Sequence, residues 1–177
     1  MNVESNSLQP TLVGDLVTVR PIRFDDWREM YSVASDPAVW ALHPVRDRYK
    51  AEIFRVFFDE AVRCGSGFSI VDNQTGTVCG SSRYYGLDVG KAEIEIGWTF
   101  LGVDYWGGAY NTELKNLMLE HAFGIVDRVI FWVGADNVRS RRAMEKLGAR
   151  LRSGTHTRAL SGDTPYVIYE IERTARG

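Results

Sequence analysis

EIEIGWTFLGVDYWGGAYN (93–111) is the stretch of sequence that decides the fold. In its first part glutamates alternate with isoleucines, and this period of two predicts a strand because successive side chains of a strand face opposite sides. Its second part, WGGAY (106–110), is a glycine-bearing loop. A helix is expected directly after it, over 112–125, because apolar residues recur there at helical spacing. The residues of that face are Leu114, Leu117, Met118, His121, Ala122 and Ile125.

A strand, a small-residue loop and a helix in succession form a binding site for an anion. Glycines leave backbone N–H groups uncovered, and the positive end of the helix dipole points at the same place. A second strand, RVIFWVG (128–134), follows the helix. The unit is therefore predicted to be a right-handed βαβ crossover whose two strands are parallel.

The remaining segments predict a mixed α/β sheet in one domain, 1–177, with a loose leader over 1–11. An ordered loop is expected over 36–47, which contains two prolines, and a turn over 161–163. Strands are expected over 16–22, 67–72, 77–87, 150–157 and 165–173, and helices over 24–35, 47–65 and 137–147.

Composition and charge exclude several classes of function. The net charge of −2 and the pI near 5.9 give no support to nonspecific nucleic-acid binding, which needs a basic surface. Cys64 and Cys79 show neither CxxC spacing nor a grouping with histidines that would bind a metal. The sequence shows no secretory signal and no apolar run long enough to cross a membrane. These observations predict a cytoplasmic protein with reduced thiols and no bound metal.

Three motifs resemble those of the GNAT superfamily of acetyl-CoA-dependent N-acetyltransferases, within it the ribosomal-protein-alanine acetyltransferase type. They are EIGW (95–98), YWGGAYNTE (105–113) and NVRSRRAMEKLGA (137–149), and the order of elements extends the resemblance over 12–173. The resemblance implies a sheet with helices on both faces. It also implies a parallel strand pair that splays into a V-shaped opening, into which acetyl-CoA enters as co-substrate.

The resemblance also implies which residues hold acetyl-CoA. The pantetheine arm would pair with the backbone of Thr99, Phe100 and Leu101, and the pyrophosphate would lie on the loop of Gly107, Gly108, Ala109, Tyr110, Asn111 and Thr112. Asn137 matches an asparagine that hydrogen-bonds the pantetheine, with Ser140 one helical turn later. Asparagine is equally a good helix N-cap, so Asn137 can serve either purpose or both. Arg142, in the basic run that follows, is the candidate for the 3′-phosphate.

The loop departs from the usual family pattern W-G-K-G-Y-A-T-E at three positions. Gly108 replaces the lysine, Ala109 the second glycine and Asn111 the small residue. The Cβ of Ala109 could crowd a phosphate where glycine allows close approach, and the Gly107-Gly108 pair could compensate.

Acetyl transfer to an amine needs a base, because only the neutral amine attacks a thioester. Glu95 matches the carboxylate of the family's E-I-G-Y/W strand and is the first candidate. Glu93 lies two residues back on the same predicted face and is the alternative, although alternating glutamates most often form a solvated face. Two neighbouring carboxylates would raise the pKa of one of them, which suits a base that works near neutrality.

The sequence offers several candidates for the group that protonates the leaving thiolate. Met144 stands where many GNAT enzymes carry a tyrosine, and a thioether has no proton to donate. Ser140 matches the serine proposed for this role in the ribosomal-protein type, and a capping role explains it equally well. Water, or no acid at all, would also suffice, because coenzyme A is a tolerable leaving group.

The acceptor site is expected where the family builds it, from Trp40, His43, Tyr84 and Tyr85. Aromatic side chains with Glu93, Glu95 and Asp88 nearby would favour a cationic acceptor. The expected reaction is acetyl transfer to a primary amine, either a small molecule or a protein N-terminus. The sequence leaves open whether the protein forms a homodimer.

Two other interpretations stay open at this stage. A non-catalytic acyl-CoA-binding or regulatory module would explain Met144, Ala109 and Asn111. An unrelated nucleotide-binding domain is the other, but neither of the two common glycine-rich phosphate motifs occurs in the sequence.

Overall fold

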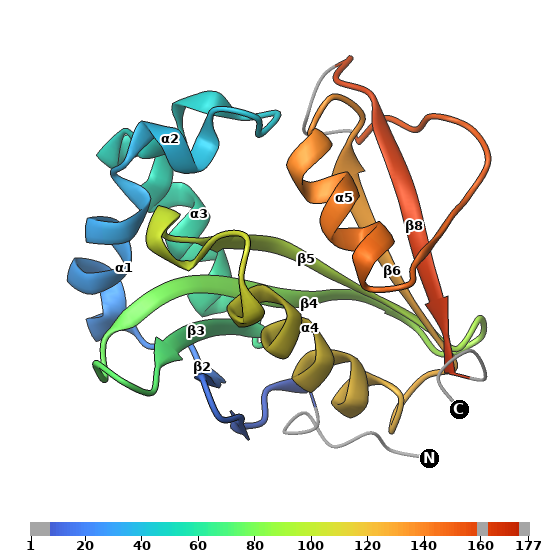
Figure 1. Cartoon of the computed structure of the whole chain (residues 1–177), viewed down its shortest axis with the longest axis horizontal. Helices are drawn as coiled ribbons and strands as arrows, with labels where there is room; N and C mark the ends of the chain where they lie inside the picture. The colour runs from blue at the N-terminus through green and yellow to red at the C-terminus, as the bar shows by residue number, and fades with distance from the viewer. Residues whose placement is uncertain (1–7, 159–162, 174–177) are drawn as a thin grey trace.

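The computed structural model describes residues 8–158 and 163–173, which form an eight-stranded mixed sheet with helices on both faces (Figure 1). The strand order is β1-β2-β3-β4-β5-β6-β8-β7. The strands are β1 (Leu12–Val13), β2 (Val17–Pro21), β3 (Gly67–Asp72), β4 (Val78–Asp88), β5 (Glu93–Leu101), β6 (Arg128–Gly134), β7 (Arg150–Leu151) and β8 (Tyr166–Glu172). The α-helices are α1 (Trp27–Ala34), α2 (Pro37–Trp40), α3 (Ala51–Arg63), α4 (Ala109–Ala122) and α5 (Val138–Lys146).

The predicted βαβ unit is confirmed. Strands β5 and β6 are parallel, whereas the other paired strands of the sheet are antiparallel. The parallel register runs only from Glu93↔Arg128 to Glu95↔Ile130, although β5 continues to Leu101 and β6 to Gly134. The two strands therefore separate after Glu95, which creates the predicted V-shaped opening.

A β-bulge lies at the beginning of this opening. Between Ser81↔Phe100 and Arg83↔Gly97 the register advances two residues on β4 and three on β5. Trp98 takes up the extra residue with a φ of 51°, an uncommon conformation for a bulky side chain. The bulge places Trp98 and Thr99 against different layers: Trp98 packs with the core of α1–α3, while Thr99 meets α4.

Each face of the sheet has its own hydrophobic core. One core joins α4 and α5 to the sheet, and its buried residues include Ile94, Ile96, Leu114, Met118, Phe131 and Met144. The other joins α1–α3 to the opposite face around Met30, Trp40, Phe54, Phe58 and Phe100. The opening between β5 and β6 therefore lies between two layers of helices, α4 and α5 on one face of the sheet and α1–α3 on the other (Figure 1).

Three parts of the chain differ from the predictions. Helix α2 and a 3-10 turn, Arg46–Tyr49, form within the predicted loop 36–47 and just beyond it, because Asp36 accepts a capping hydrogen bond from Ala38 N–H and Pro37 favours a first helical turn. Helix α3 begins at Ala51 instead of 47, since Lys50 is extended. The strands of the tail are shorter than expected. Residues 1–7 of the expected leader, and 161 and 162 of the expected turn, lie outside the described residues.

Candidate active site

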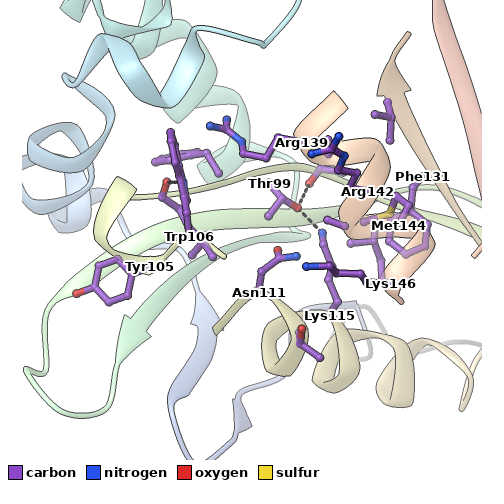
Figure 2. A pocket seen from close by; sticks show the side chains of 18 of the residues that line it. Thr99, Tyr105, Trp106, Asn111, Lys115, Phe131, Arg139, Arg142, Met144 and Lys146 are labelled. Atoms are coloured by element: carbon purple, nitrogen blue, oxygen red, sulfur yellow. Dashed lines mark hydrogen bonds between the residues drawn. The ribbon is translucent and has the colours of Figure 1, made fainter. Parts of the chain in front are cut away.

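A cleft of about 1340 Å³ occupies the opening between β5 and β6 (Figure 2). Its walls are the diverging strands, the loop before α4, the inner side of α4, the first turns of α5, and the segment around α2. The predicted cofactor residues Thr99, Phe100, Leu101, Gly107, Gly108, Ala109, Asn111, Thr112, Asn137, Ser140 and Arg142 all line it. Tyr110 does not; its hydroxyl contacts Asp72 instead.

The loop before α4 has the geometry of an anion site. Gly107 has a φ of +70°, which favours glycine, and Cβ atoms built on Gly107 and Gly108 would meet nothing within 4 Å. Gly108 is the N-cap of the 14-residue α4 and supplies no capping side chain, so the first amides of the helix face the cleft. Ala109 is already the first helical residue. The left-handed position that requires glycine is therefore Gly107, and the departure at Ala109 leaves it intact.

Cationic side chains stand opposite this loop on α5. Arg142 and Lys146 are exposed and line the cleft. Arg139 lies across its mouth, with its guanidinium 3.7 Å from the ring centroid of Trp106 and donating to the Val39 carbonyl at 3.1 Å. Exposed amides on one wall and three cations on the other fit an elongated polyanion such as coenzyme A.

Asn137 caps helix α5. Its Oδ1 accepts a hydrogen bond from Ser140 N–H at 3.1 Å, and the residue is buried at the cleft wall. The capping interpretation of Asn137 is thus confirmed. A contact to the cofactor from Asn137 or from the Ser140 side chain stays a prediction.

Glu95 is buried at the point where β5 and β6 separate. Its carboxylate pairs with Arg158 and accepts a hydrogen bond from Trp132 N–H on the opposite strand. The Arg158 guanidinium lies 4.7 Å from the ring centroids of both Trp98 and Trp132, two cleft-lining residues. Burial raises the pKa of Glu95 to about 7 against the opposing pull of Arg158 and Arg83.

Glu93 has a different environment, although it lies on the same strand face. It pairs with Arg128 at 3.6 Å and with Arg152, which also binds Glu170. It lies at the paired end of the two strands and is absent from the cleft lining. Glu95 does not line the cleft either, but it is the last residue of β5 in the parallel register, and its partner Arg158 lies against the cleft residues Trp98 and Trp132. Glu93 instead lies in an ion-pair network.

The four predicted acceptor residues separate into two groups. Trp40 and His43 line the cleft. Tyr84 is buried on the other side of the sheet, where its hydroxyl donates to the Met118 carbonyl at 2.6 Å, and Tyr85 is exposed beside Trp98. Neither tyrosine lines the cleft, so their location gives no support to a role in acceptor binding.

The charges behind this wall are opposite to the expectation of an acidic acceptor site. Arg48 bonds to His43 and stacks on Trp40 and Phe57. Burial, with help from Arg48, lowers the pKa of His43 to about 3. Arg83 and Arg158 stand beside Trp98. Glu95 is thus surrounded by arginines, while Asp88 is engaged by Lys91 near a turn.

Lys115 is the residue that sequence reasoning missed. It is 3% exposed, projects from α4 into the cleft, and donates to Thr99 Oγ1 at 2.6 Å (Figure 2). Burial lowers the pKa of this lysine to about 7. Its spacing held a signal: Met118, Leu119 and Ala122, all buried, follow it by three, four and seven positions.

The family profile described as "Acetyltransferase (GNAT) domain" matches residues 17–150. The chain belongs to the GNAT acetyltransferase family. GNAT acetyltransferases use acetyl-CoA as the acyl donor. A comparison with curated proteins gives no match.

Solved structures share this GNAT fold. A GCN5-related N-acetyltransferase from Brucella melitensis has a TM-score of 0.82 and 19% identity, over 94% of this chain and 80% of that one. A GNAT-family acetyltransferase from Bacillus anthracis has a TM-score of 0.75 and 22% identity, over 92% and 98%. Mycobacterium smegmatis RimJ, solved with CoA-disulfide, has a TM-score of 0.72 and 18% identity, over 96% and 90%. At these identities the likeness shows the fold alone.

Within the described residues, no helix is long and apolar enough to span a membrane, and no three acidic, histidine or cysteine side chains gather as metal ligands.

Proposed function

We propose that this GNAT protein transfers the acetyl group of acetyl-CoA to a primary amine, with Glu95 as the general base. The observation that carries the proposal is the position of Glu95, a buried carboxylate with a pKa of about 7 at the point where the two strands separate. A base with this pKa is half ionised at neutral pH and can accept a proton from an ammonium or an attacking amine. Because the carboxylate is 5% exposed, we propose that the proton reaches it through water.

Residues of the cleft would bind acetyl-CoA, the acyl donor. The N-terminal amides of α4 with Gly107 and Gly108 would hold the pyrophosphate, and Arg142 the 3′-phosphate. The free edge of β5 over Thr99–Leu101 would pair with the pantetheine amides. When bound, acetyl-CoA supplies an activated acyl carbon, and these residues fix its position relative to Glu95.

The acceptor would enter beside Trp40 and His43. The sequence motifs, which resemble those of the ribosomal-protein type, support a protein N-terminus, and a small amine is the other class. The arginines beside this wall favour an acceptor that carries an anionic group near its amine, because Arg48 has no carboxylate within salt-bridge distance in the described part of the chain. A cytoplasmic location without nucleic-acid or membrane partners, and a homodimer as an open assembly, remain part of the proposal.

The test is an acceptor screen with acetyl-CoA in which released thiol is measured, with calorimetric titration of acetyl-CoA alongside. Turnover with at least one amine, dependent on Glu95, would support the enzyme. Binding of acetyl-CoA without turnover over a panel of amines and N-terminal peptides would support the acyl-CoA-binding module instead. Stabilisation by NAD or ATP but not by acetyl-CoA would overturn both.

A further inference from the structure

The buried Lys115 begins a chain of hydrogen bonds that runs into the sheet at the bulge. Its ammonium donates to Thr99 Oγ1 at 2.6 Å, and Thr99 Oγ1 lies 2.8 Å from Ser82 Oγ. The Phe131 ring of β6 covers the other side, with its centroid 5.6 Å from Lys115 Nζ. Lys115 therefore lies between the two strands just beyond the last parallel pair, which ends at Ile130.

Lys115 and Glu95 reach this place from opposite layers. Lys115 projects from α4, whereas Glu95 points to the face of Arg158 and Trp98. The charge of Glu95 still raises the pKa of Lys115, so the two groups interact electrostatically across the opening. Met144 belongs to the layer of Lys115 and lines the same part of the cleft, as Figure 2 shows.

The fold itself gains nothing from a lysine here. Burial of an ammonium costs free energy unless a carboxylate and further hydrogen bonds offset it. Among the described residues no carboxylate lies within salt-bridge distance of Lys115, and its ammonium donates to the neutral hydroxyl of Thr99. An apolar residue would pack better against Phe131. A buried cation without a counter-charge, at the wall of a ligand cleft, is a sign of a functional group.

We propose that Lys115 is the catalytic acid of this GNAT site and protonates the departing thiolate of coenzyme A. The proposal rests on the proposed function. As the amine nitrogen bonds to the acyl carbon, the carbon–sulfur bond breaks and its electron pair goes to sulfur. Lys115 gives its proton to that sulfur and becomes a neutral amine, while the proton of the attacking amine goes to Glu95. Water then returns one proton from Glu95 to Lys115, so the enzyme is regenerated.

Lys115 thus supplies the proton that a thioether at position 144 cannot give. It competes for this role with Ser140, whose hydroxyl is a far weaker acid than an ammonium. An acid with a pKa near that of the thiol and near the working pH is well matched to protonate it. The base and the acid would then flank the reacting carbon from the two faces of the sheet.

The test uses coenzyme A itself and needs no acceptor. The ultraviolet absorbance of the thiolate gives the pKa of the thiol bound to the protein, measured for the unaltered chain, for Lys115→Met and for Lys146→Met. Methionine keeps the length and packing of the lysine stem. Lys146 is the matched control, since it is an exposed cleft lysine whose removal is expected to weaken binding without moving the thiol pKa. Among the other charged groups, Glu95 on β5 acts on the pKa of Lys115, and Glu113 and Glu120 on α4 and Arg142 on α5 line the same cleft.

The bound thiol should have a pKa at least one unit higher in Lys115→Met than in the unaltered chain, with no such rise in Lys146→Met. Turnover of Lys115→Met should fall at least tenfold and lose its alkaline limb. An equal thiol pKa in all three proteins, with coenzyme A bound, would overturn the proposal and leave the proposed function standing. Failure of all three proteins to bind coenzyme A would overturn both. Lys115→Gln provides a second substitution should the methionine variant not fold.

Discussion

Charged side chains have different surroundings at the two ends of the β5–β6 strand pair. At the paired end, Glu93 and Glu170 lie in a network with Arg128, Arg150 and Arg152, and hydrogen bonds from Arg152 and Arg150 hold the pKa of Glu170 below its usual value. At the open end, burial moves the pKa of Glu95 and of Lys115 toward 7 from opposite directions. The charges at the paired end are compensated within the fold. At the open end Glu95 has a single ion-pair partner, Arg158, and Lys115 has none among the described residues.

The largest expected effect separates the two glutamates. Glu95→Gln should lower turnover by roughly a hundredfold or more, because the base is lost, while the dissociation constant of acetyl-CoA stays nearly unchanged. It should also remove the acid limb of the pH–rate profile near pH 7. Glu93→Gln is the matched control on the same strand face. Turnover of this variant should change less than about threefold, because the Glu93 carboxylate forms ion pairs with Arg128 and Arg152 and is not the base. Loss of activity in Glu93→Gln with full activity in Glu95→Gln would reverse the comparison.

The second effect concerns binding at the open end. Gly108→Val should weaken acetyl-CoA binding by more than tenfold, about 1.4 kcal/mol, by placing a branched side chain where amides are exposed. The backbone of Gly108, with φ −112°, accepts a side chain without strain, so the fold should persist. Gly76→Val, at a remote hairpin turn, is a control for general destabilisation, because Gly76 has a φ of +72° and lies outside the cleft. Calorimetry that gives the same dissociation constant for Gly108→Val and the unaltered chain would remove the loop from the site.

The third effect is on stability as a function of pH. The pKa of Glu95 is raised from 4.5 to about 7, so its contribution is present below pH 4.5 and is lost as pH rises toward 7. The pKa of Lys115 is lowered from 10.5 to about 7, so its contribution is present above pH 10.5 and is lost as pH falls toward 7. Together they make the free energy of unfolding smallest near pH 7.

Lys115→Met should abolish the rise in stability between pH 7 and 10.5 and raise the free energy of unfolding at pH 7 by roughly 1 to 4 kcal/mol, the range for apolar replacement of buried ionic groups. Denaturant unfolding at several pH values measures this. A variant less stable than the unaltered chain at every pH would mean that Lys115 is a structural residue.

The contrast between the two ends shows what the sequence could and could not predict. Alternation and glycines are local signals, so they were sufficient for β5, the loop and α4. The different environments of Glu93 and Glu95 depend on where β5 and β6 stop pairing. They also depend on Arg158, which is 63 positions away from Glu95 in the sequence. Lys115 was missed because the apolar stripe of α4 was drawn through Leu117 and His121, and one lysine beside it resembles a solvated residue. Charge compensation is a property of the assembled fold.

The smallest expected effect is at Met144, where many GNAT enzymes carry a tyrosine. Met144 is 4% exposed at the cleft wall in the layer of Lys115, so a phenol introduced there would stand near the same sulfur. If Lys115 already donates the proton, Met144→Tyr should change turnover less than tenfold, because a second acid is redundant. In the Lys115→Met background the same substitution should restore turnover several-fold, since the phenol then provides the missing proton. Steady-state turnover in the four proteins of this cycle measures the coupling directly. A large gain from Met144→Tyr in the unaltered chain would mean that its open end lacks an acid, and would favour the acyl-CoA-binding module.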